Sequence, residues 1–213
     1  QGAMGMGMYH PVYLQRAREI CDQYQVHLIA DEIAVGFGRT GTLFACNQAG
    51  ITPDFLCLYK GLSGGYLPLS VVMTTDAIFQ VFYTDKAAHA FLHSHSHTGN
   101  ALACRAALAT LDIFEQDQVI DGNKVKAAYL NKMAEPLSAH SKVRHFRNCG
   151  MIWAFEVETD DPDFAAKCFQ AGLSQGLLLR PLGKTIYFMP PYVINEQEMN
   201  LLVDGTLHVL DGL

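Results

Sequence analysis

The chain has 213 residues, half of them apolar and 17% charged, so we expect a folded chain with a sizeable core rather than a disordered one. The formal net charge of −6, without any basic run, argues against a nucleic-acid surface. We also expect no membrane span and no secretory leader, because no long uncharged apolar stretch is present. The six cysteines are scattered without a CxxC pair, which indicates reduced thiols and a cytoplasmic protein.

The periodicity of apolar side chains predicts the elements in chain order. Helical spacing predicts helices at residues 9–25, 99–114, 123–137, 163–176 and 195–210. Short apolar runs predict strands at residues 26–32, 54–60 and 70–75, two strands around Cys149 and Gly150, and further strands at 177–181 and 185–192. The first three runs are typical of buried parallel strands, so the expected class is α/β.

Two reactive side chains follow predicted strands. Taken alone, Asp31 fits a helix cap or a loop ion pair, and Lys60, just before a glycine-rich loop, fits a solvated charge. Because the carboxyl ends of parallel strands meet at one edge of a sheet, we expect Asp31 and Lys60 to lie near each other. Pyridoxal phosphate needs such a pair: an amine to form a Schiff base with its aldehyde, and an acid to keep its ring nitrogen protonated.

Residues 28–46 (LIADEIAVGFGRTGTLFAC) and 51–70 (ITPDFLCLYKGLSGGYLPLS) resemble the signature of the class III pyridoxal-phosphate aminotransferases. That family has an Asp-Glu pair, a GFGRTG segment, and then the cofactor lysine before a Gly-Gly loop. The resemblance implies that Lys60 is catalytic and holds pyridoxal phosphate, that Asp31 pairs with the ring nitrogen, and that Ile33 packs against the ring. It also implies the α/β fold of the PLP-dependent transferases, fold type I.

Three histidines alternate in residues 93–104 (HSHSHTGNALAC), and on a strand they would share one face. A zinc site is one interpretation, but no carboxylate or thiolate stands at a supporting spacing, so we predict no metal. The resemblance instead implies that Ser96 reaches the cofactor phosphate of the neighbouring subunit. Ser94 on the substrate side and His95 on the cofactor side would line the same entrance, in a homodimer that shares its sites across the interface.

Arg180 is expected to end the strand at 177–181. It fits either a structural arginine or a clamp for a substrate carboxylate, which a planar guanidinium suits. Residues 177–194 and 2–14 resemble one branch of the family, which aminates 8-amino-7-oxononanoate in biotin biosynthesis. For this chain, that implies Arg180 on the acceptor carboxylate, Arg39 and Tyr187 near the substrate, and S-adenosylmethionine or, less commonly, lysine as amino donor.

The resemblance covers the whole chain but only the later part of a family member. We therefore expect the rear of the large α/β domain in residues 1–117 and the small C-terminal α+β domain in residues 118–213. Without the phosphate loop of the family's N-terminal half, the chain alone is expected to bind the cofactor poorly and to expose part of its sheet. Two alternatives stay open: a class III ω-aminotransferase acting on ornithine, 4-aminobutyrate or a polyamine, and an inactive fragment.

Overall fold

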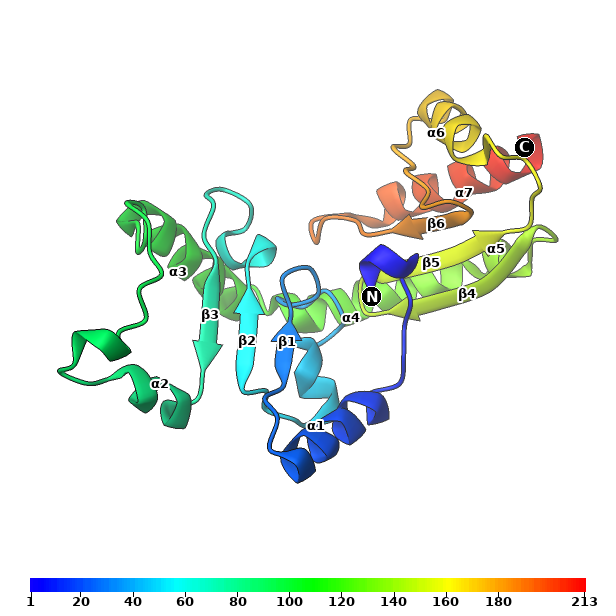
Figure 1. Ribbon diagram of the computed structural model, residues 1–213. Coiled ribbons are helices and arrows are strands. Elements are labelled where there is room, and N and C mark those ends of the chain that lie inside the picture. Colours follow the sequence, from blue (N-terminus) through cyan, green and yellow to red (C-terminus); the bar gives the residue numbers. More distant parts are fainter. The chain divides into compact units, whose positions relative to one another are not determined.

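Two three-stranded sheets organise the chain, which is described here from a computed structural model of residues 1–213 (Figure 1). Contacts within the chain group it into two compact units. The β1–β3 unit contains residues 9–38 and 42–119, and the β4–β6 unit contains residues 1–8, 39–41 and 120–213. The predicted domain boundary between residues 117 and 118 stays a prediction.

The sheet of the β1–β3 unit has the order β1-β2-β3. Strand β1 (Ile29–Asp31) runs parallel to β2 (Phe55–Leu58), as predicted. Strand β3 (Val71–Thr74) instead runs antiparallel to β2, because the loop between them has no crossover helix to return the chain to the same end. All four residues of β3 are exposed, in line with the uncovered sheet surface that we expected.

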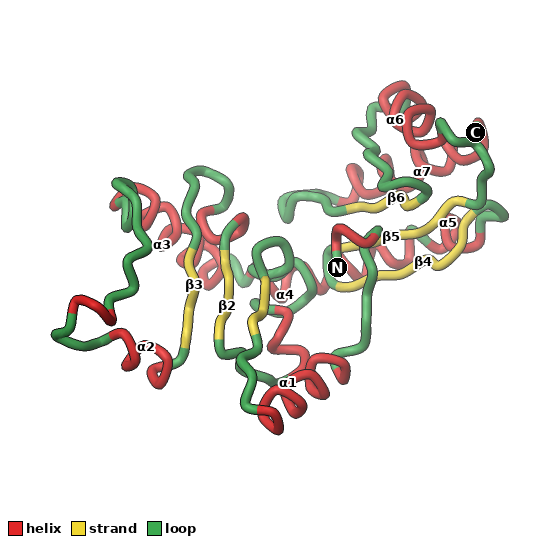
Figure 2. The backbone as a smooth tube through the Cα atoms, in the orientation of Figure 1, coloured by secondary structure: helices red, strands yellow, loops and turns green.

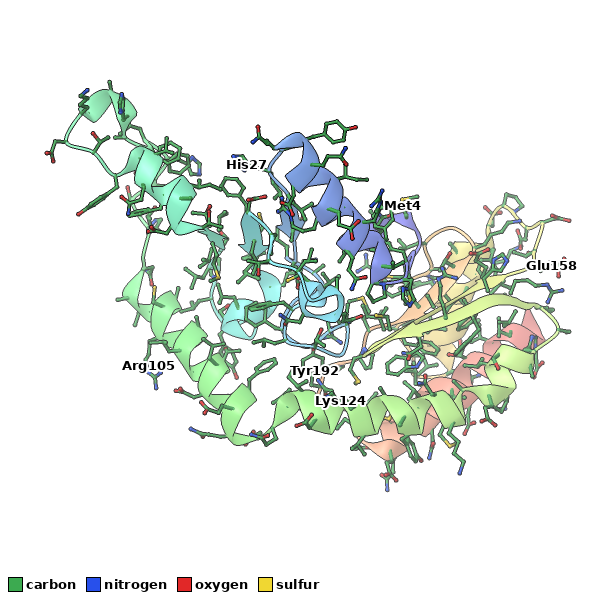
Figure 3. All side chains as sticks on the ribbon, turned by 90° about the horizontal axis from the view of Figure 1, so that it is seen from below. Met4, His27, Arg105, Lys124, Glu158 and Tyr192 are labelled. Carbon is green, nitrogen blue, oxygen red and sulfur yellow. The ribbon has the colours of Figure 1, made fainter.

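Three α-helices belong to this unit: α1 (Val12–Tyr24), α2 (Asp76–Phe82) and α3 (Ala101–Gln116). Helix α3 begins at the N-cap residue Asn100, whose side chain accepts a hydrogen bond from the Ala103 amide. Its Ala107 packs with residues of β2 and the loops into a small core, formed by Phe37, Leu56, Leu58, Leu62 and Ala107. The charged side chain of Arg105 points outward from α3 (Figure 3).

The sheet of the β4–β6 unit is antiparallel, with strands β4 (Val143–Cys149), β5 (Ile152–Val157) and β6 (Thr185–Phe188) in that order. Its helices are α4 (Val119–Met133), α5 (Glu135–Ala139), α6 (Phe164–Ser174) and α7 (Glu196–Gly212). Trp153 and Phe155 of β5 are fully buried in the larger of the two cores. The predicted hairpin and helices are confirmed, with a new helix starting just before Pro136.

Loops and short 3-10 helices connect these elements (Figure 2). The 3-10 helices are η1 (Gly2–Met4), η2 (Ala45–Ala49), η3 (Lys60–Ser63) and η4 (Ala87–His89). The predicted strand at 177–181 is wrong: its leucines 177 and 179 face the core, but no neighbouring strand pairs with them, and only Leu182 forms an isolated bridge, to Thr185. None of the helices combines the length and apolar character that a membrane crossing requires.

Candidate active site

Asp31 is the last residue of β1, and its carboxylate is exposed. Its Oδ1 accepts a hydrogen bond of 3.0 Å from the backbone N–H of Ile33, two residues further along. This Asx-type turn restrains the rotation of the carboxylate and leaves Oδ2 available for another donor. Ile33 itself is half-buried directly beside it.

Lys60 lies two residues beyond the end of β2, where it opens η3, rather than within the strand as predicted. Its amine is exposed and makes no hydrogen bond or ion pair. Gly61 packs against the buried Phe37, and a Cβ at Gly61 would lie 2.8 Å from the Cβ of Phe37. The turn closes at Gly64, whose positive φ of 60° favours glycine. The glycines after Lys60 therefore form a tight turn that presents the amine at the surface.

The register of the two parallel strands brings Asp31 and Lys60 to the same edge of the sheet. Asp31 pairs with Cys57, and Lys60 follows Cys57 by three positions. Strands lie about 4.8 Å apart, so the two side chains start from neighbouring positions at the carboxyl ends of β1 and β2. An acid and a free primary amine at one sheet edge fit the ring nitrogen and the aldehyde of pyridoxal phosphate.

Glu32, for which no role was predicted, is 3% exposed, whereas its neighbour Asp31 is exposed. Its carboxylate accepts hydrogen bonds from the backbone N–H groups of Ala45 (2.6 Å) and Cys46 (2.8 Å). Burial, reinforced by the neighbouring Glu32, raises the pKa of the Cys46 thiol to about 12. Alternation beyond the end of β1 indicates only that Glu32 turns to the opposite side from Asp31; its backbone partners at residues 45–46 leave no pattern in the sequence.

Residues 93–99 form a loop and a turn before α3, not the strand on which three histidines would share a face. His95 organises this turn: its backbone N–H donates to Thr98 Oγ1 (3.0 Å), and its Nδ1 accepts from the His97 amide (3.1 Å). Ser94 and Ser96 are exposed in the same segment. No group of three or more His, Cys, Asp or Glu side chains is arranged to hold a metal ion.

Three predicted substrate residues belong to the β4–β6 unit. The Nη1 of Arg39 donates to the carbonyl of Pro190 (2.7 Å), and its guanidinium lies over the ring of Tyr192. Burial lowers the pKa of Arg39 from its ordinary value. Arg180 is exposed in the connection between α6 and β6, and Tyr187 is half-buried on β6. The guanidinium of Arg180 is thus displayed at the surface, whereas that of Arg39 has partners within its own unit.

Comparison with protein families gives a match to the model for "Aminotransferase class-III" over residues 1–210. The adenosylmethionine-8-amino-7-oxononanoate aminotransferase of Helicobacter pylori is 48% identical over 219 aligned residues, which cover all of this chain and 50% of that protein. The corresponding enzyme of Geobacter sulfurreducens is 39% identical, with the same coverage. The chain thus spans about half the length of the curated relatives that it matches.

Solved structures give the same result for the fold. The crystal structure of adenosylmethionine-8-amino-7-oxononanoate aminotransferase from Methanocaldococcus jannaschii superposes with a TM-score of 0.92 at 34% identity, covering 99% of this chain and 51% of that one. The ω-transaminase from Pseudomonas jessenii, solved in complex with PMP, superposes with a TM-score of 0.87 at 27% identity over 94% of this chain and 46% of that one. The predicted α/β fold of the type I transferases is confirmed.

Proposed function

Because this chain belongs to the class III aminotransferase family, we propose that it is part of a pyridoxal-phosphate-dependent aminotransferase that converts 8-amino-7-oxononanoate into 7,8-diaminononanoate. The observation that carries the proposal is the position of Asp31 and Lys60 at the carboxyl ends of two paired parallel strands. The high identity to enzymes named for this acceptor over the full length of the chain supports the choice of substrate.

Lys60 would hold the cofactor through its amine, and Asp31 would hold the proton on the ring nitrogen. Pyridoxal phosphate, when bound, supplies an electron sink for the carbon that loses a proton. Once a donor amine has displaced it from the cofactor, the Nζ of Lys60 would take that proton and return it to the neighbouring carbon of the cofactor, as general base and acid. Ile33, whose amide already orients the Asp31 carboxylate, would pack against the ring face.

Ser96 and His95 would meet the cofactor phosphate of a second subunit, and Ser94 would lie beside the substrate there. The exposed position of this turn ahead of α3 supports that role, since nothing within its own unit covers it. The active enzyme is accordingly a homodimer with shared sites. Its six cysteines are all free thiols, which fits an enzyme of the reducing cytoplasm.

Arg180 would clamp the far carboxylate of the acceptor, because an exposed guanidinium can form two parallel hydrogen bonds with a carboxylate. Tyr187 and Arg39 would lie near the same substrate. The cation–π contact of Arg39 with Tyr192 supports an indirect role for Arg39, through the shape of the 190–192 segment. S-adenosylmethionine is the proposed donor, with lysine as the other candidate.

The decisive experiment replaces Lys60 in the holoenzyme, and a second experiment replaces Arg180. Lys60→Ala should abolish turnover, and borohydride reduction of the unmodified enzyme should fix the cofactor on Lys60, which peptide mass spectrometry detects. Lys86→Ala, which changes another exposed lysine, is the control and should keep full activity. Cofactor fixed on any other lysine would refute the assignment.

Arg180→Ala tests the acceptor. It should raise the KM for 8-amino-7-oxononanoate by a factor of about 10 to 100, since a hydrogen-bonded charged group contributes about 1.5–3 kcal/mol. Arg105→Ala, which removes an exposed arginine from α3, is the control. If ornithine, 4-aminobutyrate or a polyamine reacts faster than 8-amino-7-oxononanoate, the alternative ω-aminotransferase is correct. If the wild-type protein gives neither a cofactor absorption band nor turnover, the inactive-fragment alternative is correct.

A further inference from the structure

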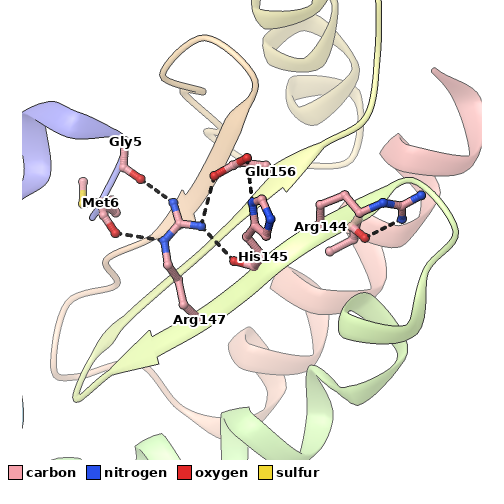
Figure 4. A network of polar contacts seen from close by, with 7 residues as sticks. Gly5, Met6, Arg144, His145, Arg147 and Glu156 are labelled. Atoms are coloured by element: carbon pink, nitrogen blue, oxygen red, sulfur yellow. Dashed lines mark hydrogen bonds and ion pairs between the residues drawn. The ribbon is translucent and has the colours of Figure 1, made fainter. Parts of the chain in front are cut away.

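The side chain of Arg147, on β4, binds backbone carbonyls of segment 2–7 (Figure 4). Its Nε donates to the carbonyl of Met6 (3.0 Å) and its Nη2 to the carbonyl of Gly5 (2.5 Å). The remaining Nη1 donates to the carbonyl of His145 (2.8 Å) and lies 3.6 Å from a carboxylate oxygen of Glu156. With a side chain only 20% exposed, Arg147 uses every nitrogen of its guanidinium for these contacts.

The backbone at both ends of this network is unusual. Gly5 has a φ of 68°, and two residues that are not glycine, Met6 and His145, have φ values of 58° and 52°. A positive φ is unfavourable for a residue with a side chain unless its surroundings hold it in place. The hydrogen bonds from Arg147 to the carbonyls of all three residues supply that restraint.

The restrained segment contacts the strand that follows Arg180. A Cβ on Gly5 would lie 3.0 Å from Oγ1 of Thr185, which is buried and begins β6. Thr185 also closes a turn with Leu182 through two backbone hydrogen bonds of 2.8 and 3.0 Å. That turn starts two residues after Arg180. Segment 2–7 therefore packs on Thr185, the residue at which the connection from Arg180 enters β6.

The register of the sheet brings the same guanidinium towards Tyr187. Arg147 pairs with Ala154, and Ala154 pairs with Tyr187, so the three side chains form one row on one face of the sheet. Ala154, which lies between the two larger side chains in this row, is fully buried. Segment 2–7 therefore lies over the face that carries Tyr187 and contacts the start of β6, while Arg147 fastens it there.

We propose that Arg147 is a positioning residue for the acceptor, acting through segment 2–7 on the connection that carries Arg180 and on the face that carries Tyr187. This inference rests on the proposed function, because it takes those two residues as the acceptor site. In this role Arg147 would not touch the substrate. It would fix the positions of Arg180 and Tyr187, which bind the acceptor. The loss of Arg147 should therefore weaken acceptor binding more than it slows the chemistry.

The test compares Arg147→Gln with Arg144→Gln in the holoenzyme. Arg144 is a matched control on the same strand: its guanidinium also donates to two backbone carbonyls, of Ser141 and Val143, and pairs with Glu158, but it does not contact segment 2–7. Arg147→Gln should raise the KM for the acceptor about tenfold and keep kcat within about threefold, whereas Arg144→Gln should change neither. Deuterium uptake of residues 2–8 should rise in Arg147→Gln alone, with or without cofactor.

Gly5→Ala probes the same contact from the other side and should raise the acceptor KM in the same way, because its Cβ would press on Thr185. If Arg147→Gln fails to fold, Gly5→Ala decides. An unchanged KM, an equal rise in Arg144→Gln, or a fall in kcat that tracks loss of bound cofactor would overturn the inference. Absence of turnover of 8-amino-7-oxononanoate by the wild type would refute the proposed function instead, and the KM comparison would then use the keto acceptor that the enzyme does accept.

Discussion

The guanidinium of Arg39 stacks on the ring of Tyr192, with 4.3 Å between Cζ and the ring centroid. The arginine comes from the GFGRTG segment that connects β1 to β2, yet its partners belong to the segment after β6, where the carbonyl of Pro190 accepts its hydrogen bond. The backbone takes part as well, because the carbonyl of Arg39 accepts from the Met151 amide (2.9 Å). Residues 39–41 are thus an integral part of the β4–β6 unit.

Replacing Arg39 should therefore destabilise the protein, whatever it does to substrate binding. Arg39→Ala should lower the free energy of unfolding by about 2–3 kcal/mol, because it removes a hydrogen bond from a charged donor together with a half-buried cation–π contact. Denaturant unfolding measures the change. Arg16→Ala is the control, since Arg16 is exposed and pairs only with Glu19. Equal effects of the two substitutions would show that the contacts of Arg39 contribute no stability.

Gly150, in the turn of the β4–β5 hairpin, contacts the backbone of residues 39–41 and has no room for a side chain. A Cβ at Gly150 would overlap the backbone nitrogen of Gly41 and the carbonyl carbon of Thr40, and the residue has a φ of 58°. We expect Gly150→Ala to cost about 3 kcal/mol or more, because only a backbone shift can relieve the overlap.

Gly122 supplies the comparison for this substitution. It lies within α4, and an added Cβ would meet nothing within 4 Å. Gly122→Ala should stabilise the protein by about 0.5–1 kcal/mol, since alanine favours a helix over glycine. Thermal and denaturant midpoints would therefore move in opposite directions for the two alanine substitutions. A small loss for Gly150→Ala would mean that the hairpin and the 39–41 segment are not in close contact.

The buried thiols of Cys46 and Cys168 should resist alkylation in the native protein. Burial raises the pKa of Cys46 to about 12 and that of Cys168 to about 11, so at pH 8 less than about one molecule in a thousand carries either thiolate. The other four cysteines are partly accessible and should react first. Mass spectrometry after timed labelling gives the order of reaction.

Glu32→Gln should speed the labelling of Cys46 and leave Cys168 unchanged. The substitution removes the negative charge that helps to keep the Cys46 thiol protonated and weakens the hydrogen bonds that hold the 45–46 backbone. Cys168 lies in the other unit and serves as the internal control. An equal acceleration at both sites would indicate general loosening instead of a local role for Glu32.

The sequence was most informative where local pattern and tertiary structure agree. The helix of residues 195–210 was predictable because its apolar residues recur at helical spacing, and the structure adds a capping box of Asn195 and Glu198 with hydrogen bonds of 3.0 and 2.9 Å. The strand predicted at 177–181 does not form, because the short apolar run at 177–179 does not show whether a neighbouring strand is present. Likewise, the direction of β3 depends on the connection after Lys60, not on the residues of β3 itself.

The candidate site divides in the same way. Asp31 and Lys60 could be placed from sequence, because each closes an apolar run and the ends of parallel strands share an edge. Glu32 and Arg147 were missed as candidates, since their partners are backbone groups that lie next to them only after folding, at residues 45–46 and 5–6. Backbone partners leave no residue-type signature, so side chains of this kind are the hardest to assign from a single sequence.

The stability of the β1–β3 unit should depend on pH through Asp54. Its Oδ2 accepts hydrogen bonds from Arg18 and from the Leu28 amide, both 2.7 Å, and these contacts hold the pKa of Asp54 below its ordinary value. A carboxyl whose pKa is lower in the folded state stabilises the protein above its unfolded pKa of about 3.9, and that stabilisation is lost as the pH falls through the lower folded pKa. Asp54→Asn should therefore lower the free energy of unfolding by about 1–2 kcal/mol at pH 7. The difference from the wild type should shrink steadily below about pH 4, when urea unfolding is followed across the pH range.

Asp121→Asn removes an exposed carboxylate from α4 that pairs only with Lys124, and it should show almost no such dependence. A constant difference between Asp54→Asn and the wild type down to pH 2 would show that the ionised carboxylate is not the stabilising species.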